Sequence, residues 1–395
     1  MALQMTGFVM ILPLFARRLE SFGAGLDALG ISALAYALTG TLCAPFMGMF
    51  ADRFGRRPII LLSLTAYVLA FCGYLWTASA WLFILIRGLA GVFTAGLIPA
   101  VASMVGDLAL ENRRAQWIGI VNGGASVGWI IGPIFGGLLY DSFGYSVPFA
   151  VSIGIESCAL FLALFLVPET YKPSARSGGI RPAWTRGLAA LPTIYLIMLV
   201  SFTVMFAWAF IEPQFMFYAY DDLVWTSSQL GLAMSAWGLA CAVGEFALGR
   251  LSDRLGRKPV IVLGVALFSA QFIGLVIFRD AIWLVVSFIL GGLGNSLFDP
   301  ALSAHILDIT PPEHTARIMG FKATAGSLGN MLGPALVVLF APYIGPQGVF
   351  RVAAALVLVV TLATAFALRV PQRKQGLVNF QTPKFRSKEK GDATC

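Results

Sequence analysis

Several ionisable side chains stand inside long apolar stretches of this sequence. A charged group in the hydrocarbon core of a bilayer is costly, so each such residue is a candidate for function. The acids among them could bind protons or cationic compounds, because a carboxyl group in apolar surroundings can be protonated near neutral pH. The candidates for proton coupling or for lining a cavity are Arg87, Glu212, Glu245, Asp299 and Lys322.

Two interpretations of Asp299 are open. Asp299 precedes Pro300, as Glu212 precedes Pro213, and each pair joins an acid to a helix-bending residue. Asp299 and Glu245 are the first candidates for exchanging protons or binding a cationic compound, and Glu212 follows. Alternatively, Lys322 pairs with Asp299 and keeps it ionised, which would make both residues structural.

A charged segment, GMFADRFGRRP (48–58), separates two apolar runs and returns as GRLSDRLGRKP (249–259). Gly48 and Asp52 lie four residues apart and so share a helix face, with Asp52 within reach of Arg56. A basic loop that only sets topology is the simpler explanation, but arginines alone would serve that purpose. The glycines and the aspartate, present twice, favour a gating role.

Other chemistries find little support. The five cysteines form no CxxC pair and the two histidines, His305 and His314, stand apart, so we expect neither disulfides nor a metal site. No GxxxxGK[ST] phosphate-binding loop is present, so ATP is not the expected energy source. The sequence also has no GxSxG motif, and we expect neither an enzyme nor a cofactor.

The composition is that of a membrane protein. Hydrophobic residues make up 58% of the 395 and charged residues 12%, with a mean hydropathy of +0.83. An ordinary soluble domain carries roughly twice that charged fraction. The net charge of +8 comes from short loops and the C-terminal tail, which the positive-inside rule explains without nucleic acid. We expect a lipid bilayer around the protein and no nucleic acid partner.

Twelve apolar runs predict twelve membrane helices, because lipid leaves helix as the form for runs of this length. The first run lacks the basic start of a signal peptide and falls slightly short of the ~20 residues needed to span. We expect it to be a short first helix or the remainder of a longer one. The runs fall near 1–16, 28–51, 58–77, 80–107, 114–140, 144–168, 189–215, 227–251, 258–278, 281–307, 315–341 and 346–369.

The charges between the runs predict orientation and organisation. Most Lys and Arg lie in alternate loops and in the tail, so that side is cytoplasmic and both termini face it. The longest basic loop divides the runs six and six. The predicted parts are an N-terminal six-helix half (1–168), a cytoplasmic linker (169–188), a C-terminal six-helix half (189–369) and a basic cytoplasmic tail (370–395).

The two halves repeat each other at an offset of 201 residues. One register holds over roughly 85 residues, which indicates an internal duplication with both copies in the same orientation. The matching pairs include Gly48 with Gly249, Asp52 with Asp253, Arg53 with Arg254, Gly55 with Gly256, Arg56 with Arg257, Asp107 with Asp308, Gly128 with Gly329, Gly132 with Gly333 and Pro133 with Pro334.

These motifs resemble those of the major facilitator superfamily. GMFADRFGRRP is similar to the signature loop between helices 2 and 3 of that family, and RGLAG (87–91) to its second motif. GWIIGPIFGG (128–137) is similar to GxxxGPxxGG in helix 5 of its drug:proton antiporters. The resemblance covers nearly the whole chain. It implies an all-α integral membrane protein with two pseudo-symmetric six-helix halves, acting as a monomer in the plasma membrane, which is the inner membrane in a bacterium.

The resemblance also implies roles for residues. Arg87 would influence proton movement, unless it is a structural partner of a carbonyl or an acid. Glu156 ranks below the other acids because its helix is usually peripheral. A charge latch would hold the halves together in the outward-facing state; it comprises Gly48, Asp52, Arg53, Gly55, Arg56, Arg57, Asp107, Asp253, Arg254 and Arg257. A hinge or anti-leak seal, or else ordinary close packing, would involve Gly128, Gly132, Pro133, Gly136 and Gly137.

The leading hypothesis is a proton-coupled antiporter that exports small amphipathic or lipophilic compounds by alternating access. Aromatic residues at 202–220 predict an apolar pocket lined by Phe206, Phe210 and Phe217. The alternative is a permease for a specific metabolite or nutrient, which the helix 5 motif disfavours. Tetracycline exporters carry an aspartate where Gln4 stands here, so we do not expect tetracycline as the substrate.

Overall fold

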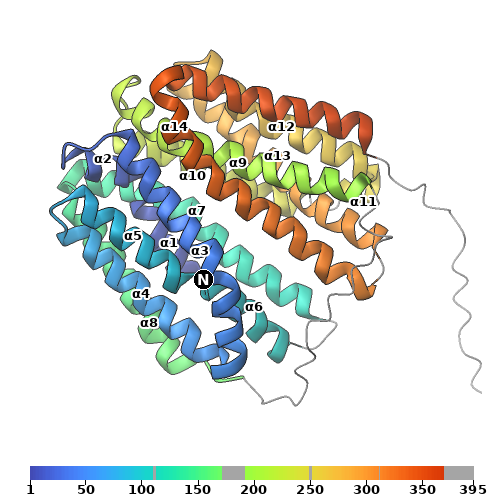
Figure 1. Cartoon of the computed structure of the whole chain (residues 1–395), viewed down its shortest axis with the longest axis horizontal. Coiled ribbons are helices and arrows are strands. Elements are labelled where there is room, and N and C mark those ends of the chain that lie inside the picture. The colour runs from blue at the N-terminus through green and yellow to red at the C-terminus, as the bar shows by residue number, and fades with distance from the viewer. Residues whose placement is uncertain (110–112, 171–191, 249–250, 311, 369–395) are drawn as a thin grey trace, which may run out of the picture.

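A computed structural model describes residues 1–109, 113–170, 192–248, 251–310 and 312–368 of the chain. Almost all of these residues are helical, in two bundles that lie side by side (Figure 1). The N-terminal bundle consists of α1 (Ala2–Ile11), the 3-10 turn η1 (Leu12–Leu14), α2 (Phe15–Glu20), α3 (Leu26–Phe54), α4 (Arg56–Trp76), α5 (Ala80–Thr94), α6 (Leu97–Leu108), α7 (Arg114–Phe143) and α8 (Ser146–Leu166).

The C-terminal bundle has the same construction. Its helices are α9 (Pro192–Asp221), α10 (Ser227–Leu248), α11 (Leu251–Leu255), α12 (Arg257–Ile277), α13 (Ala281–Ile309) and α14 (Pro312–Ala367). Gly345, with φ of 65°, divides α14 into two helices. Eleven helices of the described chain are long and apolar enough to cross a membrane. Counting α14 as two gives twelve, and the predicted all-α fold with two six-helix halves is confirmed.

The first span extends past its two arginines. It runs from Ala2 to Glu20, with the 3-10 turn at Pro13 interrupting the helix. Arg18 is buried because its guanidinium donates to the carbonyl oxygens of Tyr74, Leu75 and Thr77, at 3.3, 3.0 and 2.6 Å. These carbonyls close the C-terminal end of α4, where a helix has acceptors to spare. The arginine therefore caps a neighbouring helix instead of ending its own.

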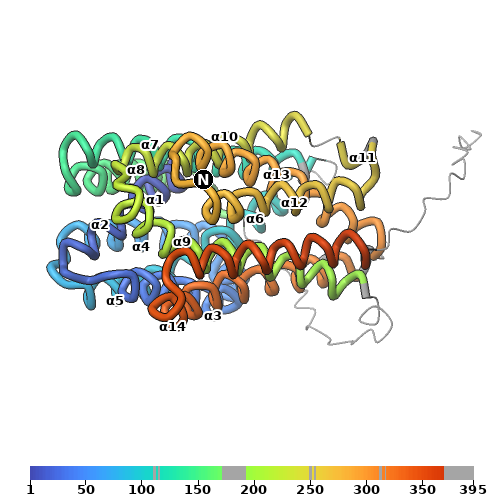
Figure 2. Tube along the Cα trace, turned by 90° about the horizontal axis from the view of Figure 1, so that it is seen from above, coloured from blue at the N-terminus to red at the C-terminus, as the bar shows by residue number. Residues whose placement is uncertain are grey.

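The two bundles meet along two pairs of helices, with α7 beside α10 on one side of the molecule and α3 beside α14 on the other (Figure 2). The helices of both bundles run in roughly one common direction in both views. One end of the molecule carries the basic loops, including the one between α3 and α4; we call it the basic end. The described part of the linker stops at Thr170, and the predicted tail lies outside the described residues.

Contacts between the bundles gather towards the end opposite the basic loops. A Cβ on Gly231 of α10 would overlap the Pro133 carbonyl of α7, and one on Gly30 of α3 would overlap Val338 of α14. Towards the basic end the described residues leave room, since a Cβ on Gly48 or Gly119 would meet no atom within 4 Å. The bundles are thus joined at one end and separated at the other.

Candidate functional site: a cavity between the bundles

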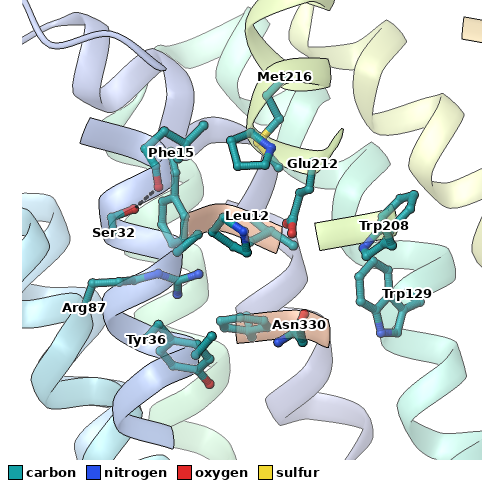
Figure 3. A pocket seen from close by; sticks show the side chains of 16 residues that line it. Leu12, Phe15, Ser32, Tyr36, Arg87, Trp129, Trp208, Glu212, Met216 and Asn330 are labelled. Atoms are coloured by element: carbon teal, nitrogen blue, oxygen red, sulfur yellow. Dashed lines mark hydrogen bonds between the residues drawn. The ribbon is translucent and has the colours of Figure 1, made fainter. Parts of the chain in front are cut away.

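A cavity of about 240 Å³ lies between the two bundles (Figure 3). The N-terminal bundle contributes side chains from α1, η1, α2, α3, α5 and α7, and the C-terminal bundle from α9 and α14. Most of the wall is apolar or aromatic. The lining residues are Phe8, Leu12, Phe15, Leu29, Ser32, Ala33, Tyr36, Ala37, Arg87, Trp129, Trp208, Glu212, Pro213, Met216, Asn330 and Pro334.

Arg87 reaches this cavity from α5. Ser79 caps the start of that helix by accepting a hydrogen bond from Leu82 N at 3.3 Å, and Arg87 follows two turns later. Only 5% of the arginine is exposed. Its guanidinium carbon lies over the rings of Phe15 and Tyr36, 4.6 and 4.4 Å from their centroids. Nε and Nη1 have no hydrogen-bond partner among the described residues, so two charged donors remain available.

Glu212 reaches the cavity from the other bundle. It stands on α9 directly before Pro213, one turn after Trp208, and it points into the cavity across from Arg87 (Figure 3). Within the described chain the two side chains make no ion pair within 4 Å. The structure thus brings two of the five predicted ionisable residues, Arg87 and Glu212, to one cavity from opposite bundles.

The aromatic wall differs from the one predicted. Phe206 and Phe210 stack on each other, 5.4 Å between centroids, inside the C-terminal bundle and do not line the cavity. Phe217 borders a separate depression at the end opposite the basic loops. Trp208 lines the cavity instead, and its ring stacks on Trp237 at 5.6 Å. The prediction for the three phenylalanines was wrong, because α9 is apolar on every side and its sequence does not show which face meets the cavity.

The other predicted acids lie elsewhere. Lys322 Nζ pairs with Asp299 Oδ1 at 2.6 Å and donates to Ser303 Oγ at 2.8 Å. Glu245, on α10, is exposed and does not line the cavity. Of the two open interpretations of Asp299, this geometry favours the structural pair with Lys322.

The charged cluster at the basic end is assembled within one bundle. Arg56 pairs with Asp52 at 2.8 Å and with Asp107 at 3.3 Å. Gly55 has φ of 108°, a backbone conformation that a side chain would disfavour. Glu169 accepts hydrogen bonds from the backbone N–H groups of Arg56 and Arg57, at 3.1 and 3.2 Å. The predicted latch residues of the first copy are therefore preassembled, and the carboxylate caps the start of α4.

The second copy repeats this geometry. Arg257 pairs with Asp308 at 2.8 Å, the counterpart of the pair between Arg56 and Asp107. Gly256 has φ of 89°, as Gly55 has a positive φ in the first copy. The side chains of Asp253 and Arg254 lie outside the described residues, as does Gly249. The ion pairs described for both clusters, those of Arg56 and of Arg257, join residues of the same bundle.

The glycine-rich face of α7 packs on two helices. A Cβ at Gly128, Gly132 or Gly136 would overlap the backbone of α1 in the same bundle. A Cβ at Gly137 would overlap Ser227 of α10 in the other bundle. Pro133 lies between these contacts and faces α10. The predicted glycine motif thus fixes the position of α7 within its bundle and, at Gly137, against the partner bundle.

Sequence reasoning missed Asp141 at the end of α7. Its Oδ1 accepts from Ser227 N at 3.1 Å, and its Oδ2 accepts from Ser228 N at 2.8 Å and Ser228 Oγ at 2.5 Å. Both serines open α10, so Asp141 caps a helix of the other bundle. The available signal was weak: a single acid near the end of an apolar run, before Gly144.

Glu156, which was ranked below the other acids, is a buried group. It is 0% exposed, and its carboxyl oxygens have no hydrogen-bond partner among the described residues. Gln4 and Ser152 are likewise buried with unpartnered side chains. A Cβ on Gly7 would lie 3.4 Å from Glu156 Oε2, so this glycine lets α1 approach α8 and enclose the acid. Glu156 therefore lies inside the N-terminal bundle, on the face of α8 that packs on α1 and α4.

The family profile of the Major Facilitator Superfamily matches residues 1–220 and 197–390, which together cover nearly all of the chain. The chain belongs to this superfamily. A tetracycline resistance protein, class C, of Escherichia coli is 29% identical over 78% of both chains. The multidrug resistance protein MdtG of Proteus mirabilis is 26% identical over 93% of this chain and 94% of the relative.

Solved structures of the same fold agree. The human organic anion transporter MFSD10 superposes with a TM-score of 0.69 at 21% identity, over 92% of this chain and 96% of that one. The nucleoside transporter NupG superposes with a TM-score of 0.72 at 15% identity, also over 92% and 96%. As a member of the Major Facilitator Superfamily, the protein is a multi-pass membrane transporter of small molecules, and this family and fold are not those of enzymes.

Proposed function

We propose that the protein is a proton-coupled antiporter that exports small amphipathic compounds by alternating access. The observation that carries this proposal is the cavity between the bundles, into which Arg87 and Glu212 project from opposite sides. Relatives at 26–29% identity are named for resistance to many drugs or to tetracycline. A cavity shared by two bundles can change the side to which it opens when the bundles rock.

The arrangement of the bundles supports an inward-open state. Under the positive-inside rule the basic end faces the cytoplasm, in a plasma membrane and with both termini on that side. The bundles separate at that end and join at the other. In the opposite state the preassembled clusters around Arg56 and Arg257 would meet the partner bundle and act as the latch. The transporter works as a monomer, with residues 169–188 linking its halves.

Glu212 is the proton carrier in this proposal. It lies in the cavity, whereas Asp299 is neutralised by Lys322 at 2.6 Å. A proton and a cationic substrate would compete for one carboxylate, which couples their opposite movements. Gln4 is 1% exposed and does not line the cavity. We therefore keep tetracycline outside the expected substrate range.

The test uses purified protein in liposomes with an imposed pH gradient and a panel of amphipathic dyes. We expect dye accumulation that depends on the gradient and disappears with a protonophore. Glu212→Gln should abolish it, and Glu20→Gln, a surface acid paired with Arg17, should not. Accumulation that ignores the pH gradient would contradict proton coupling. If the protein transported one metabolite and none of the dyes, the result would support a specific permease and contradict the proposed exporter.

A further inference from the structure

The charges of the cavity indicate what kind of molecule it holds. We propose that the cavity binds small aromatic zwitterions, with the anionic group of the ligand on Arg87 and its cationic group on Glu212. This inference rests on the proposed function, since the occupant is the exported compound. It goes further by stating which amphipathic compounds fit.

The guanidinium of Arg87 lacks an oxyanion. The rings of Phe8, Phe15 and Tyr36 contact it through their faces, and the Tyr74 hydroxyl also interacts with it. Aromatic faces attract the positive charge but do not replace a carboxylate in the guanidinium plane. Nε and Nη1 are left without partners although the side chain is 95% buried, with 5% exposed. A buried, unpaired charge is costly, so the site is arranged to receive an anionic oxygen.

Glu212 presents the opposite charge across the same space. It comes from α9, whereas Arg87 comes from α5, and Figure 3 shows both side chains directed at the cavity. The two groups make no ion pair within 4 Å in the described chain. An occupant placed between them can therefore contact both, and its cationic group would neutralise the carboxylate.

One positive and one negative side chain in the cavity favour a ligand that carries one charge of each sign and has no net charge. Arg87 is the basic residue and Glu212 the acidic residue among the 16 that line the cavity. A purely cationic compound would neutralise Glu212 and place a second positive charge near Arg87. A purely anionic compound would do the reverse. A zwitterion satisfies both side chains at once, and a leftover like-charge pair disfavours each alternative.

The walls and the volume favour an aromatic body of modest size. Trp129 and Trp208 line the cavity, and both pack against Trp237, which holds their rings in place. Flat indole faces favour planar partners. The volume of about 240 Å³ is below the roughly 300–1,000 Å³ usual for drug-sized ligands. One or two fused rings would fill it.

The experiment uses four probes that share one nitrophenyl group. They are para-nitrophenylalanine, a zwitterion; 2-(4-nitrophenyl)ethylamine, a cation; para-nitrophenylpropanoate, an anion; and the methyl ester of that acid, which is uncharged. Nitroaromatics quench tryptophan fluorescence, and two tryptophans line the cavity. Binding to the purified full-length protein in detergent is measured by quenching, and Trp129→Phe with Trp208→Phe reports how much of the signal comes from the cavity.

We expect the zwitterion to bind about tenfold or more tightly than each of the other three probes. Arg87→Gln should remove its advantage over the cation, and Glu212→Gln its advantage over the anion. Arg87→Lys should restore part of the lost affinity. Arg17→Gln, which removes a positive charge at the end opposite the basic loops, should leave the order unchanged. Melting temperatures establish that each variant is folded; if Arg87→Gln is not, Glu212→Gln and the probe series still decide.

Equal binding of cation and zwitterion to the unaltered protein would overturn the inference, as would an unchanged order of affinities in Glu212→Gln. The binding assay needs no pH gradient, so its result is independent of proton coupling. Gradient-driven export of dyes without zwitterion preference would remove only this inference. Zwitterion preference without gradient-driven export would remove only the proposed antiport.

Discussion

The two lines along which the bundles meet are related by the internal repeat but differ in construction. Between α7 and α10, Gly231 faces Pro133, and Gly238 faces the backbone of Trp129. Ser235 Oγ accepts a hydrogen bond from Ile134 N at 3.1 Å, and Asp141 caps α10. This contact is close and hydrogen-bonded. Of the described residues on α7 and α10, Trp129 alone lines the cavity.

The contact between α3 and α14 keeps only part of this design. Gly30, the counterpart of Gly231, lies near Pro334, the counterpart of Pro133. Val338 stands where the first copy has Gly137, and Pro342 stands where it has Asp141. Seven of the cavity-lining residues come from α3 and α14: Leu29, Ser32, Ala33, Tyr36, Ala37, Asn330 and Pro334. The two contacts occupy equivalent positions in the repeat. The contact between α7 and α10 is tightly packed, whereas the contact between α3 and α14 contributes residues to the cavity wall.

The largest difference between the two contacts should appear in a pair of glycine variants. In Gly231→Ala the new methyl group meets backbone that cannot move, so we expect a loss of about 1–3 kcal/mol from overpacking. In Gly30→Ala it meets a methyl group of the Val338 side chain instead of backbone, and a side chain can shift further than backbone. That loss should stay within about 1 kcal/mol, because alanine also favours helix. Melting temperatures in detergent measure both, and equal shifts would contradict the asymmetry.

Asp141→Ala should have the next largest effect, because it removes the cap that one bundle places on the other. We expect a loss of about 1 kcal/mol and a shift towards opening at the end opposite the basic loops. Asp280→Ala is the matched control, since Asp280 caps α13 within its own bundle by accepting from Ile282 N at 2.9 Å. A cysteine placed at Tyr140, near this end, should be labelled faster in Asp141→Ala than in the unaltered protein, and no faster in Asp280→Ala. Equal labelling rates in the two variants would show that the cap does not join the bundles.

Ser235→Ala should have the smallest effect. It deletes one hydrogen bond between the bundles, at Ile134 N, and we expect a loss of about 1 kcal/mol or less. Ser269→Ala removes a hydroxyl that bonds within its own helix, to Ala266 O at 2.6 Å. Both variants should melt close to the unaltered protein. Combined with Asp141→Ala, Ser235→Ala should lower the free energy of unfolding by less than the sum of the two single losses, because both residues belong to the contact between α7 and α10. Ser269→Ala should add its full loss. Additive losses for Ser235→Ala in a double-mutant cycle would argue against that link.

The repeat was the most reliable sequence signal. The predicted latch named Arg56, Asp107 and Arg257, and the offset matched Asp107 with Asp308. The structure pairs Arg56 with Asp107 at 3.3 Å and Arg257 with Asp308 at 2.8 Å. Turn glycines and charges at helix ends act locally, so their spacing is informative. The predicted linker and tail boundaries have no test in the described residues.

The direction in which each helix residue faces, towards the cavity, the bundle interior or the lipid, was the least predictable feature. Arg87 and Glu212 were selected because a charge in an apolar run is rare, and the cavity contains both. Phe206 was assigned to the wrong surroundings, because an apolar helix in a membrane protein has no polar face to reveal its orientation. Burial of Glu156 depends on Gly7 of α1, a contact between segments about 150 residues apart that a single sequence does not display.

The most direct test of alternating access is a pair of spin-label distances across the bundles, after replacement of the five native cysteines. One pair, Phe54 with Leu255, lies at the basic end, and the other, Phe143 with Tyr343, at the opposite end; all four are exposed. On changing pH or adding substrate we expect the first distance to shorten while the second lengthens. If both distances stay fixed under every condition, or change in the same direction, the rocking of two bundles around one cavity is contradicted.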